Sequence, residues 1–227
     1  NGALIDWGVK FAKSATGKHV KTSAIPLRDI ALLSQKEYEQ WATVPGFDFA
    51  YEHKGLLEIF QTAPVAEHAR HLVEKAHRLG LDTVLLDTAA LQQLEPHTEI
   101  NALGAILFRC DAHLYPQKLM QGLLKILREK EVQLLGNEEV VRFEKAGNSI
   151  QKVITAKNAY EAEEVVIATG AWSRNMAAMV NTKIPMMPGR GYSVTLQDSP
   201  YRVNYPAVLA EGRVAITPMD GNKIRFG

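Results

Sequence analysis

The sequence contains one cysteine, Cys110, among its 227 residues. A single thiol excludes an internal disulfide framework and is typical of a protein in a reducing compartment. A nucleophilic thiol needs a base and an electropositive setting. Because Cys110 lies just after the apolar run 105–108, we expect a buried structural thiol.

Long apolar runs, targeting signals and strong charge are also missing. No apolar stretch approaches the roughly 20 residues of a membrane span, and no signal peptide opens the chain. The formal net charge is +1, and the sequence has no long basic run or basic-aromatic stripe. The composition therefore gives no reason to expect a nucleic acid or an anionic membrane as a partner.

Common catalytic and metal-binding motifs are absent as well. The sequence has no P-loop and no G-x-S-x-G pattern. His68, His71 and His77 share one predicted helix, but no second cluster of ligands accompanies them. Because a zinc site needs three or four protein ligands, we expect solvated histidines and no metal site.

The residues that are present predict a mixed fold. Apolar residues at helical spacing predict helices over residues 3–13, 26–41, 64–79, 88–94, 116–130 and 173–179. Apolar or alternating runs between turn formers predict strands over residues 55–60, 83–86, 102–108, 140–144, 150–156, 163–168, 184–187, 192–196, 207–210, 213–217 and 223–226. Short turns indicate that the strands from 140 to 168 form a three-stranded antiparallel meander. The predicted fold class is α+β (mixed α/β), with antiparallel strands dominating the second half.

Val165–Ser173, with the sequence VVIATGAWS, is the most informative segment. We expect a buried strand that ends at Thr169-Gly170, where glycine lets the backbone approach a ligand closely. A helix that begins near Ser173 would add the positive end of its dipole. A core strand followed by an ordinary turn and helix has the same pattern, so the residues alone leave both interpretations open.

Several further segments follow one another in a recognisable order. They are Gly55–Phe60, Leu94–Pro96, Asp111–Pro116, Glu139–Val141, Val165–Ser173, Pro188–Tyr192, Ala215–Pro218 and Ile224–Gly227. No single segment is specific, but their order and spacing across nearly the whole chain resemble the D-amino-acid dehydrogenase, glycine oxidase and sarcosine oxidase family of FAD enzymes. The D-amino-acid dehydrogenase branch is the most similar, mainly through the opening helices and residues 188–196.

The resemblance also indicates what is missing. Family members open with a G-x-G-x-x-G loop that holds the FAD pyrophosphate and close with a second Gly-rich flavin loop, whereas the only G-x-G here is Gly189-Arg190-Gly191. The chain begins without Met and ends inside a predicted strand, so we expect a central fragment of a longer enzyme. The resemblance implies an antiparallel-sheet substrate domain with helices, from residues 1–100 and 183–227. Residues 101–182 would form a partial Rossmann-like FAD-binding segment that contains the meander.

On the cofactor side, the resemblance places Val140 and Val141 near the adenine of FAD. It places Thr169, Gly170 and Trp172 along the flavin. Simple strand packing is the alternative for the two valines, and a core aromatic is the alternative for Trp172.

On the substrate side, Arg190 lies between two glycines, and a guanidinium can bind a carboxylate with two donors. A solvated arginine in a surface turn is the alternative. Tyr192, Tyr205 and Arg225 fall on family strands that line or border the substrate cavity, and each could instead be structural. The sequence identifies no catalytic side chain.

The implied function is oxidation of an amino acid or amine, such as a D-amino acid or glycine, by hydride transfer to FAD. The resulting imine would hydrolyse to a keto acid and ammonia. Three alternatives remain open: a flavoenzyme of the same fold acting on a hydroxy acid or glycerol 3-phosphate, a catalytically silent binding subunit, or an unrelated α+β domain. We expect the fragment alone to be inactive and free of FAD. The parent protein would be cytoplasmic or peripheral to the inner membrane, and the sequence does not predict its oligomeric state.

Overall fold

The computed structural model describes residues 2–227, apart from the side chain of Ala3. The chain forms two compact units, the first from residues up to His19 and Leu127–Arg190, the second from Val20–Ile126 and Gly191–Gly227. The chain therefore changes unit after residues 19, 126 and 190, whereas the predicted domain assignment changes after residues 100 and 182. Which unit serves the cofactor and which the substrate stays a prediction.

The second unit is built on a seven-stranded sheet with the strand order β2-β3-β1-β8-β9-β10-β7. The strands are β1 (Leu56–Phe60), β2 (Thr83–Asp87), β3 (Gly104–Phe108), β7 (Val194–Leu196), β8 (Ala207–Leu209), β9 (Val214–Met219) and β10 (Lys223–Phe226). Only β1 and β8 pair in parallel; the other neighbours are antiparallel. The mixed α and β class with antiparallel sheets is confirmed.

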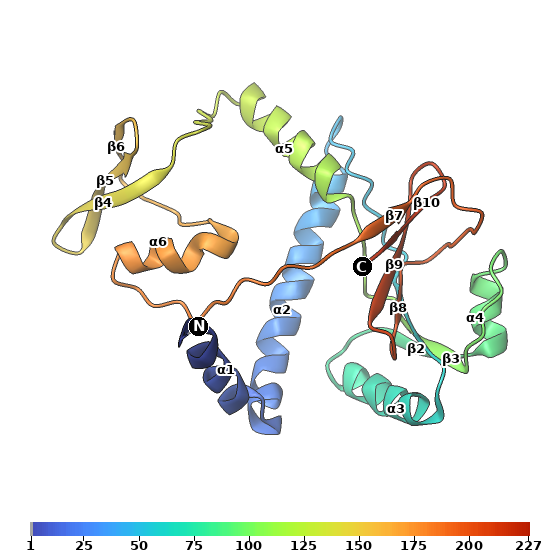
Figure 1. Ribbon diagram of the computed structural model, residues 1–227. Helices are drawn as coiled ribbons and strands as arrows, with labels where there is room; N and C mark the ends of the chain where they lie inside the picture. Colours follow the sequence, from blue (N-terminus) through green and yellow to red (C-terminus); the bar gives the residue numbers. More distant parts are fainter. Residues whose placement is uncertain (1) are drawn as a thin grey trace. The chain divides into compact units, whose positions relative to one another are not determined.

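Helices cover parts of both faces of this sheet, because successive residues of a strand point to opposite sides. Leu57 of β1 packs in one buried cluster with Leu91 of α4 (Thr88–Leu94). Phe60 of β1 packs in another cluster with Ile106 and with Ala69 of α3 (Ala63–Arg78). Figure 1 shows α3 and α4 beside the end of the sheet that holds β2 and β3.

Two longer helices contribute to the second unit. Helix α2 (Gly17–Ala42) begins nine residues before the predicted start at Pro26, which lies inside it. A proline removes one helical hydrogen bond, and the other turns of this long helix retain theirs. Helix α5 (Pro116–Glu129) brings Leu119 against Phe47 and Phe49 in a third apolar cluster. No helix within residues 2–227 is long and apolar enough to cross a bilayer.

The first unit contains α1 (Gly2–Ser14), the meander and a short C-terminal helical segment. The meander has the order β4-β5-β6, from β4 (Val140–Ala146), β5 (Ser149–Thr155) and β6 (Ala159–Glu161). The 3-10 turn η1 (Gly170–Trp172) leads directly into α6 (Ser173–Met179). The prediction of an antiparallel meander is confirmed, but its third strand lies before residue 163.

Two predicted strands are wrong. Residues 163–168 form no strand within the described chain, and Val166 is 87% exposed. An apolar run becomes a strand only where a neighbour accepts its backbone hydrogen bonds, and β6 occupies the third place in the meander. Residues 184–187 also form no strand; Pro185 and Pro188, within and just after this segment, lack the amide hydrogens that a sheet ladder requires.

Candidate functional site

The sheet of the second unit has one polar face at its β9–β10–β7 end. Arg225 lies opposite Thr217 of β9 and Thr195 of β7, and directly opposed residues share one face. The Arg225 Nε donates to the Thr195 Oγ1 at 3.4 Å. Ile216, one residue before Thr217, packs on the apolar cluster of Leu57. The arginine row therefore faces away from that core.

A cavity of about 580 Å³ opens on this polar face. Its walls are the segment 112–118, which leads from β3 into α5, and the β9–β10 hairpin. The side chains that matter most for its chemistry are His113, Tyr115, Lys118, Thr217, Asp220, Lys223 and Arg225. All of them belong to the second unit, and the cavity is the best candidate for a substrate site.

Asp220 is the one carboxylate among the residues that line this cavity, and it already forms an ion pair. The Lys118 Nζ lies 2.7 Å from the Asp220 Oδ2, and the Asp220 backbone amide donates to the Tyr115 hydroxyl. The hydrogen bond from Lys118 lowers the pKa of Asp220 and raises the pKa of Lys118. Within residues 2–227 neither Lys223 nor Arg225 lies within ion-pair distance of a carboxylate. The charge of Lys223 adds to that of Lys118 in lowering the pKa of Asp220, so Asp220 is a nearby charge for Lys223 but not its ion-pair partner.

His113 adds a buried polar atom to the same wall. Its Nδ1 is buried and has no hydrogen-bond partner within residues 2–227, while its Nε2 lies 4.0 Å from the Glu52 Oε2. Burial lowers the pKa of His113. The ring is therefore neutral near pH 7 and leaves the excess positive charge to the lysine and the arginine.

Only Arg225, among the four predicted substrate-side residues, lines this cavity. Tyr205 packs on the apolar core, Tyr192 is 83% exposed on the surface, and Arg190 is an exposed residue of the first unit. Sequence reasoning did not include Lys223 among the site residues. The Lys223-x-Arg225 alternation on one strand was the signal that could have found it.

The predicted cofactor-side residues all lie in the first unit. Gly170 has a φ of +53°, with nothing within 4 Å of where a Cβ would be. Thr169 donates through its Oγ1 to the Ser173 Oγ at 3.2 Å, and Trp172 is 70% exposed. The backbone amides of residues 164–169 donate to no other backbone group within the described chain. An open glycine beside free amide donors fits the approach of an anionic or planar ligand.

Val140 and Val141 lie at the start of β4. Val140 pairs with Thr155, and the register shifts before Arg142, so Val141 has no partner in the ladder. The Val141 side chain is exposed. A bulge at this point leaves backbone groups available to a ligand, which is compatible with the predicted place beside an adenine.

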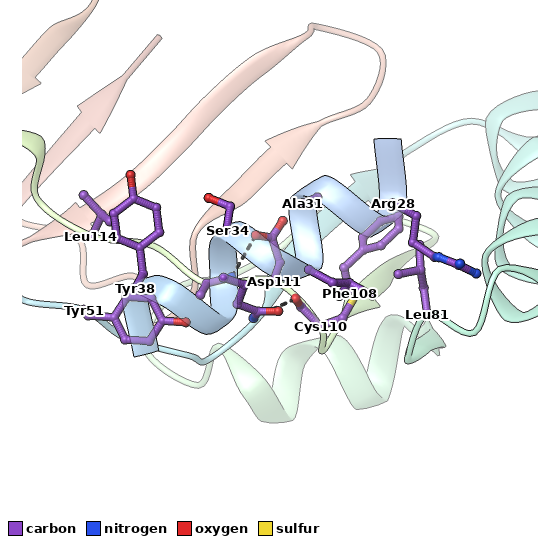
Figure 2. Close-up of a pocket in the computed structure, with 13 residues that line it drawn as sticks. Arg28, Ala31, Ser34, Tyr38, Tyr51, Leu81, Phe108, Cys110, Asp111 and Leu114 are labelled. Atoms are coloured by element: carbon purple, nitrogen blue, oxygen red, sulfur yellow. Dashed lines mark hydrogen bonds between the residues drawn. The ribbon is translucent and has the colours of Figure 1, made fainter. Parts of the chain in front are cut away.

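A second cavity, of about 400 Å³, lies between α2 and the end of β3. Figure 2 shows Tyr38, Tyr51 and Phe108 along it, with Cys110 and Asp111 between them. Cys110 is half-buried rather than fully buried, and burial raises the pKa of its thiol. A thiol with a raised pKa is a poor nucleophile at neutral pH, which agrees with a structural role.

Within residues 2–227, no group of three or more His, Cys, Asp or Glu residues could hold a metal ion. His77 instead contacts the Thr83 carbonyl oxygen through its Nε2 at 2.8 Å, and His71 lies near Glu67 and Glu74.

Comparison with known proteins identifies the class of this fold. The glycine oxidase of Bacillus cereus superposes with a TM-score of 0.79 at 24% identity, covering 89% of this chain and 56% of that chain. The D-amino acid dehydrogenase of Helicobacter pylori is 30% identical over 221 residues, which are 96% of this chain and 52% of that protein. The D-amino acid dehydrogenase of Neisseria meningitidis serogroup C is 28% identical over 228 residues, 98% of this chain and 54% of that protein.

The profile of the DAO family, described as FAD dependent oxidoreductase, matches residues 2–227. The chain belongs to this family, and the resemblance drawn from its sequence is confirmed. The chain spans about half the length of the curated relatives it matches.

Proposed function

We propose that the parent protein of this chain oxidises an amino acid or amine, with a D-amino acid or glycine as the leading substrates. The observation that carries the proposal is the positively charged cavity on the β9–β10 face, in a chain of the DAO family. When bound, FAD supplies the acceptor for the hydride that leaves the substrate Cα. Water then hydrolyses the imine product to a keto acid and ammonia.

In this proposal Arg225 binds and orients the substrate. A guanidinium matches the planar geometry of a carboxylate and donates two hydrogen bonds to it. Thr195 holds the arginine from the neighbouring strand, which reduces the side-chain entropy lost on binding. Arg190, Tyr192 and Tyr205 stay as proposed border positions of the complete site.

The proposed cofactor contacts are those of the first unit. Thr169, Gly170 and Trp172 would hold the flavin, and Val140 and Val141 would lie by the adenine. Exposed amides and the open space at Gly170 support this assignment. In the same proposal residues 1–100 and 183–227 belong to the substrate domain, residues 101–182 belong to the FAD domain, and the parent protein is cytoplasmic or peripheral to the inner membrane.

Dye reduction by the full-length protein tests the proposal. D- and L-amino acids, glycine and sarcosine would be offered with an artificial electron acceptor, alongside glycerol 3-phosphate and 2-hydroxyglutarate. We expect turnover of an amino acid. Arg225→Ala should raise KM about tenfold to a hundredfold, as loss of a charged hydrogen-bonded pair does, and Arg225→Lys should recover part of the loss.

Arg78→Ala is the matched control, because Arg78 is an exposed arginine on α3. Bound FAD without reduction by any amine would refute the amine assignment. Turnover of a hydroxy acid or glycerol 3-phosphate instead would establish the alternative substrate class, and no turnover of any kind would favour a silent binding subunit.

A further inference from the structure

Lys223 lies two residues before Arg225 on β10, so their side chains leave the same face of the sheet. Their Cα atoms are about 7 Å apart at the usual rise of a strand. Lys223 lies opposite Met219 of β9, and both cations line the cavity of about 580 Å³. The cavity therefore offers two separate positive groups in one row.

The balance of charge in this cavity is positive. Lys118, Lys223 and Arg225 contribute three positive charges and Asp220 contributes one negative charge, which leaves a net charge of two. Asp220 contacts Lys118 and the Tyr115 hydroxyl. It interacts with Lys223 as a nearby charge but lies beyond ion-pair distance of it. A ligand carboxylate that forms a two-donor pair with Arg225 leaves Lys223 available for a second anionic group.

We propose that the substrate carries a second anionic group, which binds Lys223, and that it is an amino acid with an acidic side chain. The inference rests on the proposed function, in which Arg225 binds the α-carboxylate. The carbon chain of aspartate or glutamate separates two carboxylates, and the two long flexible cationic side chains can reach both. A neutral substrate side chain forms no ion pair with Lys223, and a basic one is repelled.

A phosphate group has the same charge chemistry as a second carboxylate, so glycerol 3-phosphate is the competing source of the anion. The full-length flavoprotein would be assayed with aspartate and glutamate, with asparagine and glutamine as uncharged matches, in both D and L forms, and with glycerol 3-phosphate. We expect kcat/KM to be at least tenfold higher for the acidic amino acid than for its amide. A preference for glycerol 3-phosphate would overturn the amino acid assignment.

The Lys223→Gln variant tests the role of the lysine. We expect kcat/KM for the acidic substrate to fall about tenfold to a hundredfold, through KM rather than kcat, while values for the amide stay within about twofold. Lys223→Arg should restore most of the preference. Lys36→Gln, at an exposed lysine of α2, is the matched control. An unchanged acid-to-amide ratio in Lys223→Gln would overturn the proposal.

A binding measurement separates this inference from the proposed function. Glutarate and succinate carry two carboxylates and no amine, so they bind without turnover. We expect glutarate to raise the thermal midpoint of the full-length protein more than the monoanion butyrate does, and we expect Lys223→Gln to remove the difference. That result would support the second anionic site even if no amine reduced the dye. Equal shifts for glutarate and butyrate in the wild type would overturn it.

Discussion

Glu95, just after α4, connects the C-terminal end of this helix to the loop before β8 through hydrogen bonds. Its side chain is 2% exposed. The Asn204 amide donates to both carboxylate oxygens, at 3.0 and 2.8 Å, and the Tyr205 amide donates to Oε1 at 2.7 Å. In Glu95→Ala both amides lose their acceptor, at about 1–3 kcal/mol for each. Because Asn204 and Tyr205 are only partly buried, water replaces part of the loss, and we expect the free energy of unfolding to fall by about 3 kcal/mol.

Urea denaturation and thermal melting of the full-length protein would measure this change. Glu95→Gln keeps one acceptor oxygen, so its loss should be nearer 1 kcal/mol. Glu99→Ala is the control, because Glu99 is exposed and takes part in no hydrogen bond or ion pair within residues 2–227; we expect a change within about 0.5 kcal/mol. A loss below about 1 kcal/mol in Glu95→Ala would mean that water satisfies both amides fully, and the reasoning would be refuted.

The pH dependence of the same variants gives an independent check. Burial raises the pKa of Glu95 above the ordinary value of 4.5, although the two amides oppose the shift. The folded state then binds the proton more tightly than the unfolded chain, so this contribution to stability decreases as pH rises. This contribution of Glu95 to stability is fully present when the pH is below its ordinary pKa. It is lost as the pH rises past the higher pKa of the folded state. The stability of the wild type relative to Glu95→Gln should therefore decrease as pH rises from the ordinary pKa of 4.5 through the raised pKa of the folded state, and a constant difference would exclude burial as the dominant cause.

Three further predictions concern other parts of the chain. Gly122→Ala would place a Cβ 2.4 Å from the Phe47 ring and should lower the free energy of unfolding by about 1–3 kcal/mol. Urea denaturation would measure the change, with Gly136→Ala as the control, because a Cβ at Gly136 would have nothing within 4 Å. Burial lowers the pKa of His113, so the folded state binds this proton less tightly and stability should fall as pH drops below the ordinary histidine pKa of 6.5; His113→Gln should flatten that fall in pH-dependent melting curves. The 227-residue chain should purify without a flavin absorbance spectrum, and a bound flavin would contradict the predicted dependence on further Gly-rich loops.

The elements best predicted from the sequence are those fixed by local signals. Helix α4 matches its prediction residue for residue, because the Asp87 side chain accepts from the Ala90 amide at 2.8 Å and caps the helix. The glycine at position 80 adopts a φ of +72° just after α3, as a helix stop requires. Such features depend on neighbours within one turn.

The strand order could not be read from the sequence, because it depends on pairings far apart along the chain. Leu57 of β1 lies opposite Ala207 of β8, and nothing near either residue specifies the other. The error at 163–168 has the same origin, whereas the prolines at 185 and 188 account for the error at 184–187. Alternating apolar residues indicate that a segment could fit into a sheet, but the segment becomes a strand only when a partner strand pairs with it.

The cationic row of the candidate site depends on the register of the β9–β10 hairpin. A slip of one residue would turn Arg225 toward the core face that Ile216 occupies. The hairpin end is fixed by the contacts of Asp220 with Lys118 and Tyr115. These contacts also pair the carboxylate of the hairpin turn with Lys118, so that within residues 2–227 Asp220 forms no ion pair with Lys223 or Arg225. Asp220, Lys118 and Tyr115 therefore fix the hairpin in the register that places Lys223 and Arg225 on the cavity face. They also leave the cavity with an excess of positive charge. This local charge depends on contacts between distant residues, so the net charge of the sequence could not predict it.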